Sequence, residues 1–113
     1  KWTKPSCVLI GENNYSDASG FPYVYKTLGI GKLIGAPVPG TMTAVWWETQ
    51  IDPTIVFGIP QVGSLGINEG RYLENLQVEP DILIYNDPAS MLSGKDKQLE
   101  AAVEEMLKEI DAK

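Results

Sequence analysis

The stretch Cys7-Val-Leu-Ile-Gly-Glu-Asn-Asn-Tyr-Ser-Asp-Ala-Ser-Gly20 decides the fold that this sequence predicts. It begins as an apolar run, becomes polar after Ile10, and continues through small residues into a segment with helical spacing. A buried strand that ends in a polar turn and leads into a helix presents the side chains of the turn at the carboxyl edge of a sheet. Ser16 stands at that junction. The residues around it do not decide whether it is a nucleophile or an ordinary turn serine.

The segments around this turn predict an α/β sheet. We expect a strand at 7–12, covered on both faces because its apolar residues do not alternate with polar ones. A helix at 19–28 and a second strand at 32–36 complete a strand–helix–strand unit. Pro22 is tolerated only in a first helical turn, so the helix proper should begin near residue 20. The apolar stripe of this helix comprises Phe21, Val24, Tyr25 and Leu28.

Beyond this unit, the sequence predicts more strands and two helices. The strands are expected at 41–49, 54–62, 71–73 and 80–85. Asp87 and Pro88 have the residue types of a helix N-cap and a first helical position. The final helix is expected at 96–110, with one apolar face formed by Leu99, Val103, Met106 and Ile110.

Composition limits the class of protein. The 113 residues fit one domain or part of a larger one, and a hydrophobic fraction of 43% is typical of a folded protein. The net charge of −6 would repel a phosphate backbone, so we do not expect a nucleic-acid partner. The chain does not begin with Met, and we therefore expect it to be processed or cut from something longer.

The chain contains no histidine, which limits the chemistry that it can perform alone. A Ser–His pair, a Cys–His pair and a histidine-ligated metal site are all excluded within these residues. Cys7 is the only cysteine and lies in an apolar run, where a buried thiol is expected. Glu74 lies between two expected strands and is either partly buried or a solvated loop acid. We expect no metal and no cofactor.

Three ordered segments resemble one family of serine proteases. They are Val8–Ser19 with Leu28–Gly35 and Gly40, then Leu73–Ile82, and then Asn86–Ala102. Together they are similar to the catalytic segment of the C-terminal processing peptidase family, in its tricorn-type branch. The resemblance implies a crotonase/ClpP-like α/β fold, in which residues 1–113 are the C-terminal part of one catalytic domain whose N-terminal part is absent.

The resemblance also implies roles for individual residues. Ser16 matches the nucleophile, and the backbone N–H of Asp17 matches one oxyanion-hole donor. Glu74 matches an acid that acts through a second serine to orient the catalytic histidine. That serine, the histidine and the partner oxyanion glycine would come from a segment N-terminal to this chain.

Another branch of the family uses a Ser–Lys dyad. Its lysine would fall at Thr41, which cannot act as a base, so this mechanism is disfavoured here. The segment comprising Gly40, Thr41 and Met42 is instead expected to lie beside the substrate peptide. The implied function is a serine-type endopeptidase that hydrolyses peptide bonds through Ser16.

The alternative function is a catalytically inactive peptide-binding or scaffold domain of the same fold. For the enzyme, the resemblance implies a peptide or protein substrate, the rest of the polypeptide with its N-terminal catalytic half and a PDZ domain, and a homo-oligomer. It leaves the compartment undecided, with a periplasmic or exported location slightly favoured over a cytoplasmic one. We expect the 113 residues alone to be inactive.

Overall fold

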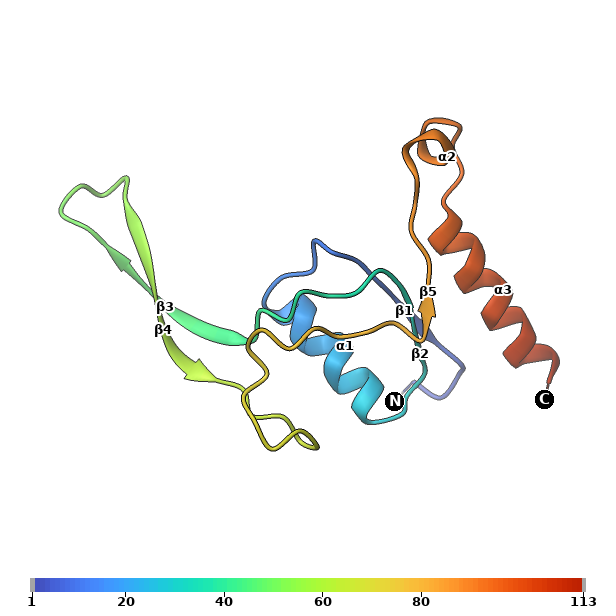
Figure 1. Cartoon of the computed structure of the whole chain (residues 1–113), viewed down its shortest axis with the longest axis horizontal. Coiled ribbons are helices and arrows are strands. Elements are labelled where there is room, and N and C mark those ends of the chain that lie inside the picture. The colour runs from blue at the N-terminus through green and yellow to red at the C-terminus, as the bar shows by residue number, and fades with distance from the viewer. Residues whose placement is uncertain (1, 113) are drawn as a thin grey trace.

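The computed structural model describes residues 2–112 and has a mixed α/β fold (Figure 1). Strands β1 (Cys7–Ile10), β2 (Lys32–Gly35) and β5 (Ile82–Leu83) form a parallel sheet in the order β1-β2-β5. The expected strand–helix–strand unit is thus present as a parallel pair of β1 and β2. Leu33 and Ile34 in β2 are fully buried, whereas Leu9 in β1 is 43% exposed because it lines an open groove between β1 and α3 (Lys97–Asp111). The expectation of coverage on both faces was therefore wrong for β1.

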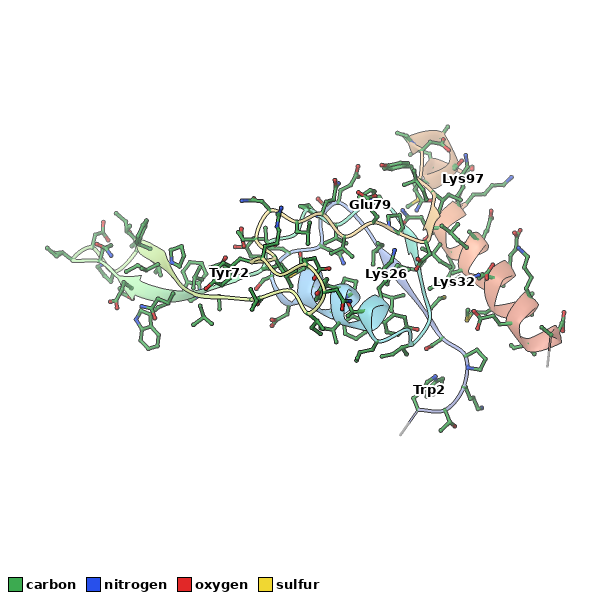
Figure 2. All side chains as sticks on the ribbon, turned by 60° about the horizontal axis from the view of Figure 1, so that its bottom comes forward. Trp2, Lys26, Lys32, Tyr72, Glu79 and Lys97 are labelled. Atoms are coloured by element: carbon green, nitrogen blue, oxygen red, sulfur yellow. The ribbon has the colours of Figure 1, made fainter. Side chains whose placement is uncertain are left out.

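Within residues 2–112, three helices accompany the sheet. Figure 1 shows the sheet between α1 (Asp17–Thr27) on one side and α3 (Lys97–Asp111) on the other, with the short α2 (Pro88–Leu92) before α3. Lys26 near the end of α1 forms an ion pair with Asp81 at 2.9 Å and donates to the Glu79 carbonyl (Figure 2), which fixes α1 to the segment before β5. None of the helices within residues 2–112 has the length and apolar character needed to cross a membrane.

A separate hairpin projects from the body of the molecule (Figure 1). It consists of β3 (Thr43–Thr49) and β4 (Val56–Gly63), which pair antiparallel. Most of its apolar side chains are exposed, and a lone two-stranded ribbon is marginally stable in water. The strand expected at 71–73 is reduced to a single bridge between Leu65 and Tyr72 near the base of the hairpin.

Helix α1 begins earlier than the sequence predicts and contains Pro22 in its interior. Proline has no N–H for the carbonyl four residues before it, here that of Ala18. The side-chain amide of Asn14 donates to this carbonyl at 2.8 Å and replaces the lost hydrogen bond. The prediction that Pro22 lies in the first turn was wrong because a side chain outside the helix supplies the missing donor.

The apolar stripes of the two long helices face outward in the described chain. Phe21 in α1 and Leu28 at its C-cap are 59% and 63% exposed, and of the predicted stripe only Tyr25 is buried. In α3, the buried residues are Ala102 and Glu105 rather than the predicted apolar face. The core cluster instead comprises Ile10, Tyr23, Tyr25, Leu33, Val38, Met42, Leu73 and Val78.

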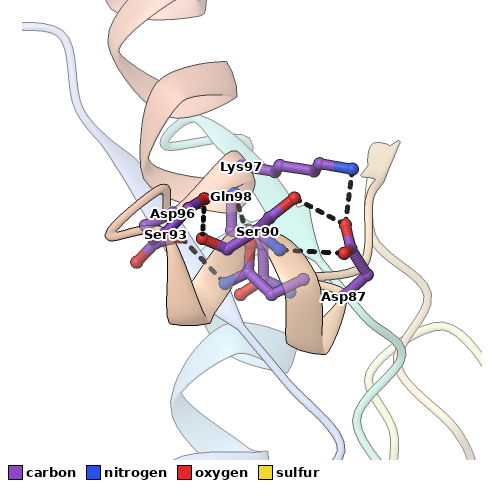
Figure 3. Close-up of polar contacts among 7 residues, drawn as sticks. Asp87, Ser90, Ser93, Asp96, Lys97 and Gln98 are labelled. Carbon is purple, nitrogen blue, oxygen red and sulfur yellow. Dashed lines mark hydrogen bonds and ion pairs between the residues drawn. The ribbon is translucent and has the colours of Figure 1, made fainter.

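The junction before α3 has the predicted capping residue. The Asp87 carboxylate accepts from the Ser90 N–H at 2.9 Å and forms an ion pair with Lys97 at 2.6 Å (Figure 3). Lys97 and the Ser90 hydroxyl hold the pKa of Asp87 far below its ordinary value. Asp96 caps α3 in the same way, through the Leu99 N–H at 3.0 Å. These caps set the direction in which α3 leaves the sheet.

A charged pair joins α3 to the sheet. The ammonium of Lys32 in β2, which Figure 2 labels, pairs with Glu105, and Glu105 is only 8% exposed. The hydrogen bond from Lys32 lowers the pKa of Glu105. Burial, followed by the charges of Glu109 and Glu105, raises the pKa of the neighbouring Cys7 thiol. Because the ion pair with Lys32 requires a charged carboxylate, it stabilises the fold only while Glu105 is ionised.

This pair predicts a specific pH dependence of folding. The pKa of Glu105 is lower in the folded chain than its ordinary value of 4.5, so its contribution to stability is complete above that value and is lost as the pH falls through the folded pKa. Denaturant unfolding measured from pH 7 to pH 3 should show a shallower loss of stability for Glu105→Gln than for the unmodified chain. Glu104→Gln, on the exposed side of the same helix, is the control. Equal pH dependence in all three proteins would contradict the assignment.

Candidate active site

Ser16 occupies a strained turn between β1 and α1. Its backbone has φ 55° and ψ −118°, a region that residues other than glycine avoid. Such a conformation costs roughly 1–3 kcal/mol and is concentrated at functional sites. Ser16 is exposed and is the N-cap residue of α1, yet its side chain makes no capping hydrogen bond. Its hydroxyl is therefore available for chemistry.

The peptide groups on both sides of Ser16 are fixed by hydrogen bonds. Its N–H donates to the Thr41 hydroxyl at 2.9 Å. Its carbonyl accepts from the N–H groups of Ser19 and Gly20 at 2.7 and 3.0 Å. The Thr41 hydroxyl also lies 3.2 Å from the hydroxyl of the fully buried Ser19. These contacts hold the strained turn in one conformation.

The backbone N–H of Asp17 lies at the start of α1, next to Ser16. Among residues 2–112, no group accepts a hydrogen bond from it. The first N–H groups of a helix have no partner within the helix, and the helix dipole makes this end favourable for negative charge. Asp17 therefore provides a donor beside the Ser16 hydroxyl to which a developing oxyanion can bind.

The chain segments at Gly40 and Leu76 approach each other closely, and this approach brings Glu74 to the same region. Gly40 has φ 82°, and a Cβ built there would lie 2.0 Å from the Leu76 carbonyl oxygen, so only glycine fits. The Gly40 carbonyl accepts from the Asn75 N–H at 3.0 Å. This close approach places the Met42 N–H 2.7 Å from the Glu74 carboxylate.

Glu74 is half-buried rather than fully solvated, so the structure favours the first of the two readings of this acid. A hydrogen bond from the Thr43 hydroxyl and one from the Met42 N–H lower its pKa. Its carboxylate is therefore ionised at neutral pH, because the groups around it are donors. An ionised, oriented carboxylate at this position is suited to hold a hydroxyl or an imidazole.

Two cavities meet at Ser16. The larger, of about 370 Å³, is lined by both Ser16 and Glu74, and its other walls include Tyr15, Thr41, Thr43, Trp47 and Pro60. The smaller, of about 120 Å³, lies on the side of Gly20, Met42 and Val62. The structure thus brings Ser16, Asp17, Thr41 and Glu74 together. Gly40 is buried behind them and lines neither cavity.

Among residues 2–112, no cluster of His, Cys, Asp or Glu could hold a metal ion.

Sequence reasoning missed several residues that shape the site. Thr43 directly follows the predicted substrate segment, and its contact with Glu74 depends on the chain crossing at Gly40. The role of Ser19 depends on Thr41, which lies 22 residues further along the chain. No local pattern indicates either contact, since both arise between segments distant in the sequence.

A family model and several curated proteins match the chain. The model of Peptidase family S41 matches residues 1–84. The tricorn protease of Thermoplasma acidophilum is 31% identical over 100 residues, which is 87% of this chain and 9% of that protein. A protein of Chlamydia pneumoniae is 34% identical over 83 residues, which is 73% of this chain and 13% of that protein. The chain therefore spans only about a tenth of the length of these relatives.

Solved structures agree with this result. The crystal structure of the tricorn protease covers 93% of this chain with a TM-score of 0.83 and 30% identity, and the match is 10% of that protein. Mature CPAF covers 71% of this chain with a TM-score of 0.62 and 29% identity, and the match is 15% of that protein. The chain belongs to Peptidase family S41, a family of serine-type peptidases, and has the mixed α/β fold of the corresponding part of the tricorn protease.

Proposed function

We propose that this chain carries the nucleophile of a serine endopeptidase and forms the C-terminal part of its catalytic domain. The observation that carries the proposal is the strained, exposed Ser16, whose hydroxyl is not used in capping and which shares a cavity with an ionised Glu74. A crotonase/ClpP-like arrangement of the complete domain follows from the resemblance and forms part of the proposal. The inactive scaffold is the alternative that the experiments below exclude or support.

The proposed reaction begins with attack of the Ser16 hydroxyl oxygen on the scissile carbonyl carbon. A histidine from the segment preceding this chain takes the hydroxyl proton as the C–O bond forms. The carbonyl oxygen becomes an oxyanion, to which the Asp17 N–H donates. The histidine then gives its proton to the leaving nitrogen as the C–N bond breaks, and water hydrolyses the resulting ester.

The cavity between Ser16 and Glu74 supports this arrangement. Its volume of about 370 Å³ has room for an imidazole and a second serine side chain. Because Glu74 is held by donors on the Met42–Thr43 side, its position is fixed before a histidine arrives. A fixed carboxylate stabilises the imidazolium that forms during attack. We propose that the segment of Gly40, Thr41 and Met42 lies beside the substrate, with Thr41 and Met42 lining the cavities and Gly40 buried behind them.

The outward apolar surface supports a role for further polypeptide around this segment. An open apolar groove of about 340 Å³ lies between β1 and α3, beside the unpaired edge of β1. Its lining comprises Cys7, Leu9, Leu99, Ala102, Val103, Met106 and Leu107. Exposed apolar patches and strand edges are sites of association. We propose that the rest of the polypeptide, or a second copy in a homo-oligomer, covers this surface.

The nucleophile assignment predicts covalent labelling at one residue. A fluorophosphonate probe should label Ser16 in the full-length polypeptide, and Ser16→Ala should abolish both labelling and peptide hydrolysis. Ser64→Ala, at a serine that lines the smaller cavity, is the matched control and should remain labelled. Labelling that persists in Ser16→Ala would exclude Ser16, and a full-length protein that is never labelled would favour the scaffold.

The absence of histidine predicts the behaviour of the isolated chain. Without a general base, residues 1–113 should show no serine-dependent hydrolysis of fluorogenic peptides above the Ser16→Ala background. The full-length polypeptide, assayed at the same concentration, serves as the positive control. Turnover by the isolated chain that disappears on Ser16→Ala would show that the base lies within these residues.

The donors around Glu74 predict a measurable change in its ionisation. Thr43→Val removes the hydroxyl donor and should raise the pKa of Glu74 toward its ordinary value of 4.5. The carboxyl carbon of Glu74 reports this pKa in an NMR titration. Thr49→Val, farther along the same strand, should leave the titration unchanged. An unaltered Glu74 titration in Thr43→Val would show that the Thr43 hydroxyl does not lower the pKa of Glu74.

A further inference from the structure

We infer that Thr41 is a positioning residue for the nucleophile: its hydroxyl oxygen holds the Ser16 N–H and so leaves the Asp17 N–H as the oxyanion donor. The inference rests on the proposed function. The starting observation is that the Thr41 oxygen accepts from the Ser16 N–H at 2.9 Å. This acceptor comes from a segment distant in sequence, so the turn sequence alone does not provide it.

The hydroxyl protons in this contact have a defined direction. The hydroxyl of Ser19 donates to the Asn14 carbonyl at 3.4 Å, and a carbonyl can only accept. The Ser19 proton is thereby used, so the Thr41 hydroxyl donates to Ser19 across their 3.2 Å contact. The chain of donors then runs from Ser16 through Thr41 and Ser19 to Asn14. Ser19 is 0% exposed, so water does not compete at the Ser19 end of this chain.

This directed chain keeps the Thr41 oxygen available as an acceptor. If the Thr41 proton pointed toward Ser16, two donors would face each other and the turn would open. Instead, the buried Ser19 hydroxyl accepts that proton, and the Thr41 oxygen accepts from the Ser16 N–H. The same Asn14 donates its side-chain amide to Ala18 in the first turn of α1. The nucleophile and the helix start are therefore held by one connected set of hydrogen bonds.

The arrangement assigns the two neighbouring N–H groups to different tasks. The Ser16 N–H is occupied by Thr41 and is not available to a substrate. The Asp17 N–H has no acceptor among residues 2–112 and lies next in the chain. Rotation of the peptide group before Ser16 would move both the hydroxyl and the Asp17 N–H. A small displacement of reacting groups costs about 100-fold in rate, so the Thr41 contact should control turnover rather than substrate affinity.

The test compares Thr41→Val with Thr41→Ser in the full-length polypeptide. Valine keeps the shape but has no oxygen, whereas serine keeps the hydroxyl. Thr41→Val should lower kcat and the rate of fluorophosphonate labelling at Ser16 by about 100-fold, with a much smaller change in KM. Thr41→Ser should restore most of both rates. Thr49→Val, on the exposed outer part of β3, is the matched control and should behave like the unmodified protein.

A second measurement does not depend on turnover. Hydrogen exchange of the Ser16 amide should be slow in the unmodified protein and in Thr41→Ser, and faster in Thr41→Val. Circular dichroism and the melting temperature show whether Thr41→Val is folded. If it is not, Ser19→Ala replaces it, since loss of the Ser19 acceptor should also speed exchange at Ser16 and slow labelling.

The outcomes separate this inference from the proposed function. A folded Thr41→Val that is labelled at the normal rate overturns the inference alone, as does a rise in KM with unchanged kcat. Failure of Thr41→Ser to restore the rate also overturns it, because the oxygen is then not the important group. A full-length protein whose Ser16 is never labelled overturns the proposed function and this inference with it.

Discussion

The hydrogen bond between the Ser16 N–H and the Thr41 hydroxyl is the contact on which the candidate site depends. The backbone strain at Ser16 is roughly 1–3 kcal/mol, whereas a single hydrogen bond contributes about 0.5–1.5 kcal/mol net. At the middle of these ranges, one contact offsets only part of the strain. Thr41 acts together with the two helix N–H groups that bind the Ser16 carbonyl, and the combined set is sufficient. The serine is exposed and fixed at the same time because its backbone, and not its side chain, makes these contacts.

The crossing at Gly40 has a similar importance for Glu74. The backbone near Leu76 approaches so closely that any side chain at residue 40 would overlap it. Because this crossing also sets the position of Thr41, one glycine determines the placement of both the Ser16 partner and the acid. The two halves of the site, from β1–α1 and from the segment after β4, are thus joined by backbone contacts rather than by the sheet alone.

The outward apolar stripes show what amphipathic patterns can and cannot indicate. The pattern in α3 correctly predicts a helix over nearly its full length, from an expected 96–110 to the observed Lys97–Asp111. It does not identify the face that packs on the sheet, where Ala102 and Glu105 are buried. An apolar face is consistent with burial against any partner. Only the tertiary structure shows that the sheet takes one face and leaves the other to the groove beside β1.

The sequence by itself determined the strand–turn–helix around Ser16, the second strand, the cap at Asp87 and the family resemblance carried by ordered motifs. These features depend on local propensity and on short patterns, which neighbouring residues specify. The tertiary structure decided the strained conformation of Ser16, the replacement of a helical hydrogen bond by Asn14, and the contacts of Thr41 and Glu74. Each of these depends on groups from segments that meet only after folding, or on the Asn14 side chain, which lies before α1 and reaches forward to its first turn. No local pattern encodes such contacts, because their energy exists only once the chain has brought the partners together.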